Sequence, residues 1–556
     1  MKIIKGLPPA PIDKETVALD VETFGQTSDK LHRPTGSFAC LSIAARSYGD
    51  KVYQIYDHND VKKVLNIAKK GEWAFHNSLY DIRQLMRYSK RRPLIPIWDT
   101  LIIDRLLYGG LYSTFSLGDL SRRHLQKKMD KDVRDDFSSL TEMTPGMREY
   151  AARDVARLLD IVDAQKANMD DGSQKIYDLI DQPAIWAILD MPPVKVDVDA
   201  WLKLSEKHAH EASIIETDLG TNVKSNPQVL KLVQAQTGIV MKNTQRKTLD
   251  SHLNDHPVFQ AIIDGRMYRD AVSRYGEKWV NKHVEDDGMV YSNWGVIGAA
   301  TGRMKSSDPN LQQIPSRRLP IFRQMFVSKY GGKMVIADVS QQEPRITAFE
   351  TQDPGLIKAI HAKEDLHLYV TRQIYGDDTI KKSDPRRSNG KDINLGLTYG
   401  LTPHGLAART DMNEQEAEIL VNAYFQRFPH VRQWMERQRQ IANRRNYVTT
   451  ANGRRGWVNM YDKHWQNNVI NMPIQGGAAD HTKLSLVLAK EMAKDDGLDF
   501  DICLVIHDEL VADAPTGTVV GWKKIMRDAF TEAADQLYPD IPFVTDVVSG
   551  DSWGAK

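Results

Sequence analysis

A pair of acids near the start of the sequence has the residue types and spacing to hold a metal ion. Asp20 and Glu22 stand two residues apart and follow the apolar run Val17-Ala18-Leu19. Because side chains alternate along a β-strand, we expect both carboxylates on one face at the end of a strand. Carboxylates this close repel each other unless a cation lies between them. Metal ions held by such oxygen ligands can activate a bound water molecule.

Two further pairs of polar residues stand four apart, as neighbours on one helix face do. They are Asn77 with Asp81 and Tyr150 with Asp154. Each pattern alone is common in solvated turns and helices, so their order along the chain carries the signal. In that order the segments resemble the proofreading exonucleases related to ribonuclease H. The resemblance implies that the catalytic metal ligands are Asp20, Glu22, Asp81 and Asp154, and that Tyr150 orients the attacking water. The alternative, a domain of this fold that only binds DNA, would lack some of these acids.

Acids also follow apolar strands in the C-terminal half. The run Met334–Ala337 leads into Asp338. The run Ile502–Ile506 leads into His507-Asp508-Glu509 and resumes as Leu510-Val511-Ala512, which predicts a β-hairpin. Each segment alone could be an ordinary turn that contains acids.

Between these acids, Arg387, Lys391 and Leu395 recur every four residues ahead of Tyr399. A helix would spread the three over an arc of roughly 120°. Two cations there could neutralise a triphosphate, and the aromatic ring could stack near a base. Taken alone, the pattern fits a solvated charged helix equally well.

Taken in order, these segments resemble the three polymerase motifs of the DNA polymerase I family. Flanking stretches match as well: Thr301-Gly302-Arg303, Asp308 to Pro315, Asp365-Leu366-His367, Gln475-Gly476 and Gly550 to Gly554. The resemblance implies that Asp338 and Asp508 hold two Mg²⁺ ions, for which Mn²⁺ could substitute, and that Glu509 supports this catalytic site.

The resemblance also implies contacts with nucleotide and DNA. Lys391 is a further catalytic candidate, as proton donor to pyrophosphate, and Glu343 would exclude a ribose 2′-hydroxyl. The implied nucleotide-binding residues are Arg387, Lys391, His367, Glu343, Leu395, Tyr399 and Gln341. The implied DNA-binding residues are Arg303, Gln475, His507, Asn310, Gln312 and Asn471. Of these, Arg303, Gln475 and His507 would check the minor-groove edge, where every correct pair offers similar acceptors.

Several positions depart from the family pattern. Leu395 stands where Phe or Tyr is common, which predicts altered discrimination between sugars. The first motif usually reads Asp-Tyr-Ser-Gln-Ile-Glu-Leu-Arg, and Val339, Gln342 and Pro344 differ from it. Asn467 stands where relatives often carry arginine.

Elements and domains must position these residues. The chain has 556 residues, of which 41% are hydrophobic and 26% charged, so we expect a globular protein of two to four domains. The predicted fold is α/β multidomain, with a ribonuclease-H-like exonuclease domain followed by a right-hand polymerase of thumb, palm and fingers around an antiparallel palm sheet. The predicted boundaries are 1–165 for the exonuclease, 166–295 for the helical thumb and connecting region, 296–350 and 470–556 for the palm, and 351–469 for the fingers.

Composition limits which compartment and which partners we expect for the protein. Two cysteines fit a reducing compartment, and the absence of a long apolar run predicts no signal peptide or membrane span. The net charge of +1 does not by itself indicate a nucleic-acid partner. Basic clusters recur, and most should be solvated: Lys90-Arg91-Arg92, Arg122-Arg123, Lys127-Lys128, Arg317-Arg318, Arg386-Arg387, Arg444-Arg445 and Arg454-Arg455.

The expected partners follow from the resemblance. They are primer-template DNA and dNTPs, with a replicative helicase, a primase and a single-strand binding protein in the same machinery. We expect a cytoplasmic monomer without a 5′-nuclease domain, similar to the short exonuclease-polymerase chains that bacteriophages encode for DNA replication.

Three other functions compete with this prediction. A single-subunit RNA polymerase shares the carboxylates, but Glu343 and the exonuclease motifs disfavour it. A non-catalytic replisome scaffold would be expected to have lost Asp338 or Asp508. An exonuclease with a vestigial polymerase would explain the departures at Leu395 and Pro344.

Overall fold

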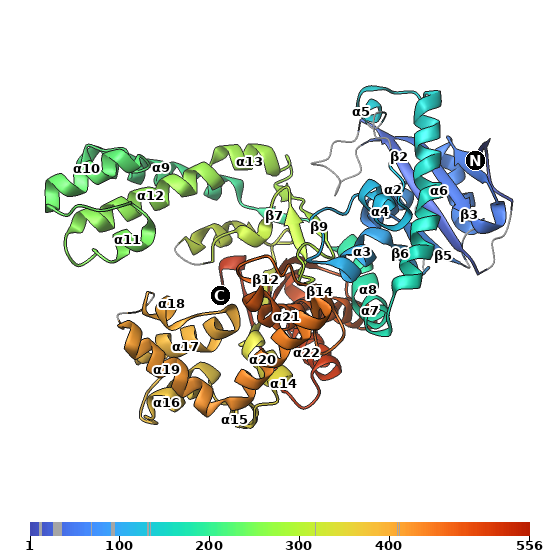
Figure 1. Ribbon diagram of the computed structural model, residues 1–556. Helices are drawn as coiled ribbons and strands as arrows, with labels where there is room; N and C mark the ends of the chain where they lie inside the picture. Colours follow the sequence, from blue (N-terminus) through green and yellow to red (C-terminus); the bar gives the residue numbers. More distant parts are fainter. Residues whose placement is uncertain are drawn as a thin grey trace.

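The computed structural model describes residues 1–9, 14–25, 36–67, 69, 71–89, 95–129, 133, 135–316, 319–408, 410 and 412–555. The described chain forms an N-terminal lobe around a sheet, a helical arm and a larger C-terminal lobe (Figure 1). The basic clusters Lys90-Arg91-Arg92 and Arg317-Arg318 lie outside the described residues. The domain assignments and boundaries given above stay predictions.

The N-terminal lobe is built on a mixed β-sheet. Its described strands have the order β1-β4-β3-β2-β5-β6, with β2 antiparallel to β3 and parallel to β5. The strands are β1 (Lys2–Lys5), β2 (Thr16–Phe24), β3 (Ser37–Ala45), β4 (Lys51–Ile55), β5 (Glu72–Phe75) and β6 (Ile97–Asp99). The helices are α1 (Val61–Ile67), α2 (Ser78–Ser89), α3 (Thr100–Tyr108), α4 (Leu117–Leu125), α5 (Asp136–Ser139) and α6 (Pro145–Asn168). The long helix α6 packs against β2 and β3 (Figure 1).

Strand β2 is longer than the apolar run predicts. Its antiparallel pairing with β3 continues to Phe24, across a register shift between Glu22 and Thr23. Asp20 and Glu22 therefore lie inside the strand, and the expectation that they stand at its end is wrong.

The helical arm has an apolar core of its own. The chain reaches the arm through α7 (Asp171–Ile176), the π-helical turn η4 (Tyr177–Asp181), α8 (Gln182–Asp190) and β7 (Val194–Val196). The arm helices are α9 (Val198–Leu219), α10 (Asn226–Thr237), α11 (Arg246–Asp250), α12 (Pro257–Tyr275) and α13 (Glu277–His283). At the tip, Val229, Val233, Leu249, Phe259 and Ile262 form a hydrophobic cluster separate from the main core. The expected helical character of this region is confirmed.

The root of the arm is aromatic. The rings of Trp201 and Trp279 stack with centroids 4.4 Å apart. The ring of Phe322 lies 5.4 Å from that of Trp201 and 5.0 Å from that of Tyr275. Phe322 belongs to the short helix η6 (Pro320–Met325), so the arm is packed against a segment of the C-terminal lobe. Offset and tilted ring pairs of this kind add to the stability that area burial supplies.

The C-terminal lobe surrounds an antiparallel sheet. Its described strands have the order β15-β16-β12-β17. They are β12 (Lys333–Ser340), β15 (Ile502–Ile506), β16 (Glu509–Ala514) and β17 (Val544–Gly550). The helices α21 (Trp465–Asp495) and α22 (Val519–Leu537) pack against the sheet, and α14 (Gln342–Thr351) packs against α21 (Figure 1). The predicted antiparallel sheet and hairpin are confirmed.

Further helices lie to one side of this sheet. They are α15 (Pro354–His361), α16 (Leu366–Tyr375), α17 (Arg386–Gly396) with η7 (Leu397–Tyr399), α18 (Pro403–Ala407), α19 (Glu414–Arg427) and α20 (Pro429–Arg445). Short strands complete the lobe: β8 (Met289–Val290), β9 (Asn293–Gly295), β10 (Lys305–Ser307), β11 (Phe326–Val327), β13 (Tyr447–Thr449) and β14 (Arg455–Trp457).

A buried ion group joins the approach to the arm with the C-terminal lobe. Arg454 donates to Asp480 at 2.7 Å and to Asp181 at 2.9 Å, and Lys483 also bonds Asp181. All four side chains are at most 2% exposed. The expectation that basic pairs are mostly solvated is therefore wrong for Arg454, because its acidic partners come from η4 and α21.

The cysteines and the apolarity of the helices bear on the expected compartment of the protein. Both Cys40 and Cys503 are buried free thiols. Among the helices of the described residues, none has the length and apolarity that spanning a bilayer requires.

Candidate active sites

The four N-terminal acids converge from three elements. Asp20 and Glu22 lie on β2, Asp81 in the first turn of α2, and Asp154 on α6. The Asp81 carboxylate accepts a 2.9 Å hydrogen bond from the Val21 amide, which fixes it beside the two strand acids. Burial, and then the charge of Asp20, raises the pKa of Asp81 well above its usual range. This site would favour a bound cation, because a cation would relieve that repulsion.

Tyr150 faces the same acids. Burial raises its pKa, and the charges of Asp154, Glu22 and Asp20 add to the effect. Tyr150 and Asp154 both lie on α6, four residues apart, as expected. Asn77 differs from its prediction: α2 begins at Ser78, and Asn77 precedes it with a φ of 72°. Its amide donates to Asp99, so Asn77 does not share a helix face with Asp81.

The donor chemistry at this site fits magnesium. The candidate ligands are all carboxylate oxygens, the type that Mg²⁺ prefers, whereas zinc favours nitrogen and sulfur. Within the described residues, no three acid, histidine or cysteine side chains are grouped closely enough to hold an ion by themselves. Magnesium commonly keeps several waters and binds one or two carboxylates together with substrate phosphate, so paired acids suffice.

The C-terminal acids meet on neighbouring strands. Asp338 lies on β12 directly opposite Glu509 on β16, and the Val339 amide donates to the Asp508 carbonyl at 3.3 Å. His507 and Asp508 form the turn of the β15–β16 hairpin, where His507 has a φ of 57°. β12 continues to Ser340, so the expectation that Asp338 ends its strand is wrong. The cause is the pairing with β17, which extends through Ser340.

Glu509 is held by groups that sequence reasoning missed. Its carboxylate accepts from Arg323 at 3.2 Å and from the Trp553 indole at 2.7 Å, and it is 5% exposed. The Arg323 guanidinium lies 4.0 Å over the Trp553 ring. Burial lowers the pKa of Arg323, while Glu509 and Asp338 oppose that change. Asp546, opposite Asp338 on β17, adds another acid to the same face of the sheet.

The predicted phosphate ligands lie on two helices, α16 and α17, that pack against each other. Arg387, Lys391 and Leu395 all lie on α17, as the four-residue spacing predicts. His367 on α16 is buried, and Asn394 approaches its Nδ1 at 3.3 Å. Burial lowers the pKa of His367 to about 4, with Lys391 and Arg387 among the contributors. A neutral His367 would donate a hydrogen bond without adding charge.

Glu343 joins several of the predicted residues. Its carboxylate accepts from the Tyr399 hydroxyl at 2.6 Å and from Arg303 at 2.9 Å. Burial, and then Glu343, raises the pKa of Tyr399, whose hydroxyl also meets Gln475. Burial lowers the pKa of His507, and Arg303 contributes to that change. Glu343, Tyr399, Arg303, Gln475 and His507 therefore form one connected patch.

The other predicted DNA-binding residues are Asn310, Gln312 and Asn471, and they differ in their hydrogen bonds. Asn310 caps η5 (Leu311–Gln313) by accepting from the Gln312 amide at 3.1 Å, and Gln312 donates its side-chain amide to the Val505 carbonyl at 3.2 Å. Both contacts order the segment beside the β15–β16 hairpin. Within the described residues, the buried Asn471 carbonyl oxygen has no hydrogen-bond partner, so a donor from a ligand could satisfy it.

Two departures from the family pattern have structural partners. Gln342 donates to His481 Nδ1 at 2.9 Å, and His481 bonds the Phe530 carbonyl at 2.9 Å, so the extra polar group is satisfied in the core. Pro344 lies in the first turn of α14, where a missing N–H breaks no helical hydrogen bond. Neither departure disturbs the placement of Glu343.

Asn467, on α21, packs against the backbone that follows η7. Gly400, which follows Tyr399, has a φ of 76°. A Cβ at Gly400 would lie within 2.2 Å of the Asn467 side-chain atoms. The Asn467 side chain can therefore pack directly against the backbone of Gly400. Any residue other than glycine at position 400 would prevent this contact.

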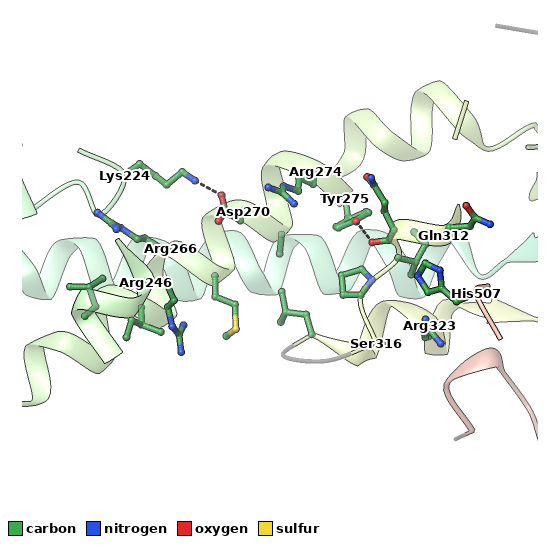
Figure 2. A pocket seen from close by; sticks show the side chains of 18 of the residues that line it. Lys224, Arg246, Arg266, Asp270, Arg274, Tyr275, Gln312, Ser316, Arg323 and His507 are labelled. Atoms are coloured by element: carbon green, nitrogen blue, oxygen red, sulfur yellow. Dashed lines mark hydrogen bonds and ion pairs between the residues drawn. The ribbon is translucent and has the colours of Figure 1, made fainter. Parts of the chain in front are cut away.

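A basic pocket runs between the arm and the hairpin. It has a volume of about 730 Å³. Figure 2 shows Lys224, Arg246 and Arg266 at one end, Arg323 and His507 at the other, and Arg274 and Tyr275 between them. Tyr275 donates to the Gln313 carbonyl at 2.8 Å, which ties α12 to η5. Sequence reasoning missed the arm residues of this pocket, because their charges resemble those of any solvated helix.

Several known proteins are similar to this chain in sequence. The family described as DNA polymerase family A matches residues 199–555. DNA polymerase I of Caldicellulosiruptor bescii is 28% identical over 404 residues, which cover 68% of this chain and 47% of the relative. DNA polymerase I of Aquifex aeolicus is 25% identical, covering 99% of this chain and 97% of the relative.

A solved structure has the same fold. The POL domain of Pol1 from M. smegmatis, in complex with DNA primer-template and dNTP, superposes with a TM-score of 0.82 at 24% identity, covering 98% of this chain and 96% of that one. The chain spans less than half the length of the C. bescii relative and 33% of the Pseudomonas aeruginosa DNA polymerase I. Because the family match covers most of the chain, this protein belongs to the family A DNA polymerases.

Proposed function

We propose that the chain synthesises DNA on a primed template from dNTPs and removes 3′-terminal nucleotides at a second site. The observation that carries the proposal is the meeting of Asp338 on β12 with Asp508 in the adjoining hairpin turn, whose carbonyl accepts from the Val339 amide. Arg387 of α17 is linked to the turn after β12 through Asp365 and Gln341. Family membership supports the polymerase assignment. The convergence of Asp20, Glu22, Asp81 and Asp154 supports the exonuclease assignment.

In synthesis, Asp338 and Asp508 would hold two magnesium ions. When bound, the ions lower the pKa of the primer 3′-hydroxyl and offset the charge of the triphosphate. Glu509 keeps its place through Arg323 and Trp553 and supports the two acids. Arg387 and Lys391 bind the phosphates by charge, and Lys391 donates a proton to the leaving pyrophosphate.

Selection of the sugar and of the base pair would involve the patch around Glu343. Bonds from Tyr399 and Arg303 fix the Glu343 carboxylate, so it can block a ribose 2′-hydroxyl. Gln475 and His507 lie next to this carboxylate and would contact the minor-groove edge of the terminal pair.

The basic pocket would bind the duplex behind the terminal pair. Its lining includes Lys224, Arg246, Arg266, Arg274 and Arg323, which suit DNA phosphates. Binding of this kind releases counterions, so affinity should fall steeply as salt rises. A dissociation constant that is flat between 50 and 200 mM salt would contradict this part of the proposal.

In proofreading, the frayed primer end would enter the Asp20 site. Tyr150 would orient the water that attacks the terminal phosphodiester, since its hydroxyl faces Asp154. Bound magnesium would activate that water and stabilise the leaving oxygen.

The test is extension of a labelled primer-template with Mg²⁺ and four dNTPs, repeated without dNTPs. Asp338→Ala should abolish extension and keep shortening, whereas Asp20→Ala should do the reverse. Shortening without extension would refute the polymerase assignment and favour an exonuclease with a relict polymerase fold. Extension without shortening would refute the exonuclease assignment alone. Loss of both activities in the parent protein would favour a DNA-binding scaffold.

A further inference from the structure

Asp365 joins three elements around the proposed triphosphate site. It precedes α16 as the N-cap, and its Oδ1 accepts from the Leu368 amide at 3.1 Å. The same oxygen accepts from the Gln341 side chain at 3.0 Å. Its Oδ2 accepts from Arg387 Nη2 at 2.6 Å. One carboxylate therefore links the turn after β12, the start of α16 and the start of α17.

The Gln341 side chain makes the second half of this link. Gln341 follows Asp338 by three residues, has a φ of 56° and immediately precedes α14. Its carbonyl oxygen accepts from the Leu366 amide at 3.1 Å, while its amide nitrogen serves Asp365. Both ends of the side-chain amide are thus engaged at the start of α16, so a contribution of Gln341 to nucleotide binding would act through Asp365.

We propose that Asp365 is a positioning residue for Arg387, holding its guanidinium at a fixed place relative to the strand that carries Asp338. This inference rests on the proposed polymerase function. The bond to Asp365 uses one donor of a group that has five, so others are left for phosphate oxygens. Arg387 is 23% exposed, so part of its side chain is accessible to a ligand.

The negative charge of Asp365 would disfavour a bound triphosphate, and a positioning role for Arg387 would offset this cost. A carboxylate near a triphosphate site repels the ligand, so it lowers affinity unless it also orders the cation. Burial favours the neutral acid, but hydrogen bonds from Arg387 and Leu368 hold the pKa of Asp365 below its usual value. The acid is therefore ionised at neutral pH, and the ordered arginine loses less side-chain entropy when phosphate binds.

A matched pair of residues provides the control. Arg386, the neighbour of Arg387, bonds Asp377 at 3.0 Å and Asp384 at 2.8 Å in an equivalent acid–arginine arrangement. Asp377→Asn therefore removes a comparable charge close by without touching Arg387. Asp365→Asn keeps an oxygen that can accept from Leu368 and Gln341, so α16 retains its cap.

The experiment measures incorporation of dATP opposite template thymine by the full chain, with KM and kcat determined separately. Asp365→Asn should raise the KM for dATP roughly 5–20-fold, the loss expected for one misplaced charged contact, with kcat changed less than about threefold. Asp377→Asn should keep the parent values. In an Arg387→Ala background, Asp365→Asn should have no further effect on KM, because its action passes through the arginine.

Other outcomes separate this inference from the proposed function. A lower or unchanged KM in Asp365→Asn overturns the positioning role, as does an effect of the same size in the Arg387→Ala background. If Asp365→Asn melts well below the parent protein, Asp365→Ser, which also caps a helix, replaces it. If the parent protein does not extend primers at all, the polymerase function itself fails.

Discussion

Replacing Arg454 by methionine should destabilise the protein by about 3–5 kcal/mol, because breaking a buried ion pair leaves an uncompensated charge. The group holds two cations and two carboxylates, and the two arginine ion pairs lie at 2.9 and 2.6 Å. Without Arg454, both Asp181 and Asp480 must share the single ammonium of Lys483. The loss exceeds that of an exposed ion pair, which contributes about 0–1 kcal/mol.

A second substitution should restore part of the loss. Arg454→Met together with Asp181→Asn leaves one cation and one carboxylate, so the group is neutral again. We expect the double variant to be at least about 1 kcal/mol more stable than Arg454→Met alone, since residues in one ion network couple by that much. Arg444→Met is the control, because Arg444 is exposed and its loss should change stability by less than about 0.5 kcal/mol.

Thermal melting followed by circular dichroism measures these differences. For a cooperative unit of 150–250 residues, each kcal/mol shifts the melting temperature by roughly 2–4 °C, so Arg454→Met should melt roughly 10 °C lower. A shift of less than about 2 °C, or a double variant no more stable than the single one, would refute the argument from buried charge.

Three further predictions follow from other sites. Burial raises the pKa of Glu350 to about 7, and its carboxylate accepts from the Ala451 amide. The folded state thus binds a proton that the unfolded state releases near pH 4.3, so Glu350 opposes folding increasingly as pH rises from there through 7. Glu350→Gln should be more stable than the parent by about 3–4 kcal/mol at pH 8 and nearly equal to it at pH 4; urea midpoints that coincide for the two proteins at both pH values would contradict this. Leu395→Tyr should change the ratio of dideoxy to deoxy incorporation roughly tenfold, as one hydrogen bond can, and an unchanged ratio in single-nucleotide assays would dismiss the sugar-selectivity hypothesis. Gly302→Ala should destabilise the protein by more than about 1 kcal/mol, because the φ of Gly302 is +83° and the new Cβ would lie 2.7 Å from the Arg454 side chain. If this variant melts and extends primers as the parent protein does, the loop adapts to the added methyl group and the argument fails.

Local patterns in the sequence predicted much of the fold and of the candidate sites. The hairpin around Asp508 and the helix that carries Arg387 and Lys391 follow from apolar strands and four-residue spacing, which depend on neighbours along the chain. Asn77 failed as a helical residue because Asp99, from another element, binds its amide.

What sequence could not predict depends on distant partners. Arg454 has the same local setting as a solvated arginine, and its burial depends on Asp480 and on Asp181, which is 273 residues away. The arm side of the basic pocket and the hydrogen bonds of Asp365 to Gln341 and Arg387 were missed for the same reason. Phage origin, replisome partners and metal occupancy stay predictions, since no local pattern or contact tests them.

The aromatic root of the arm also connects the position of the arm with that of Arg323. Phe322 packs against the arm through Trp201 and Tyr275, while the next residue, Arg323, bonds Glu509 opposite Asp338. A tilt of the arm that keeps the rings packed must move the short helix η6, and with it the Arg323 guanidinium. Under the proposed function, duplex binding along the arm and the placement of Glu509 would therefore be coupled through this one turn of backbone.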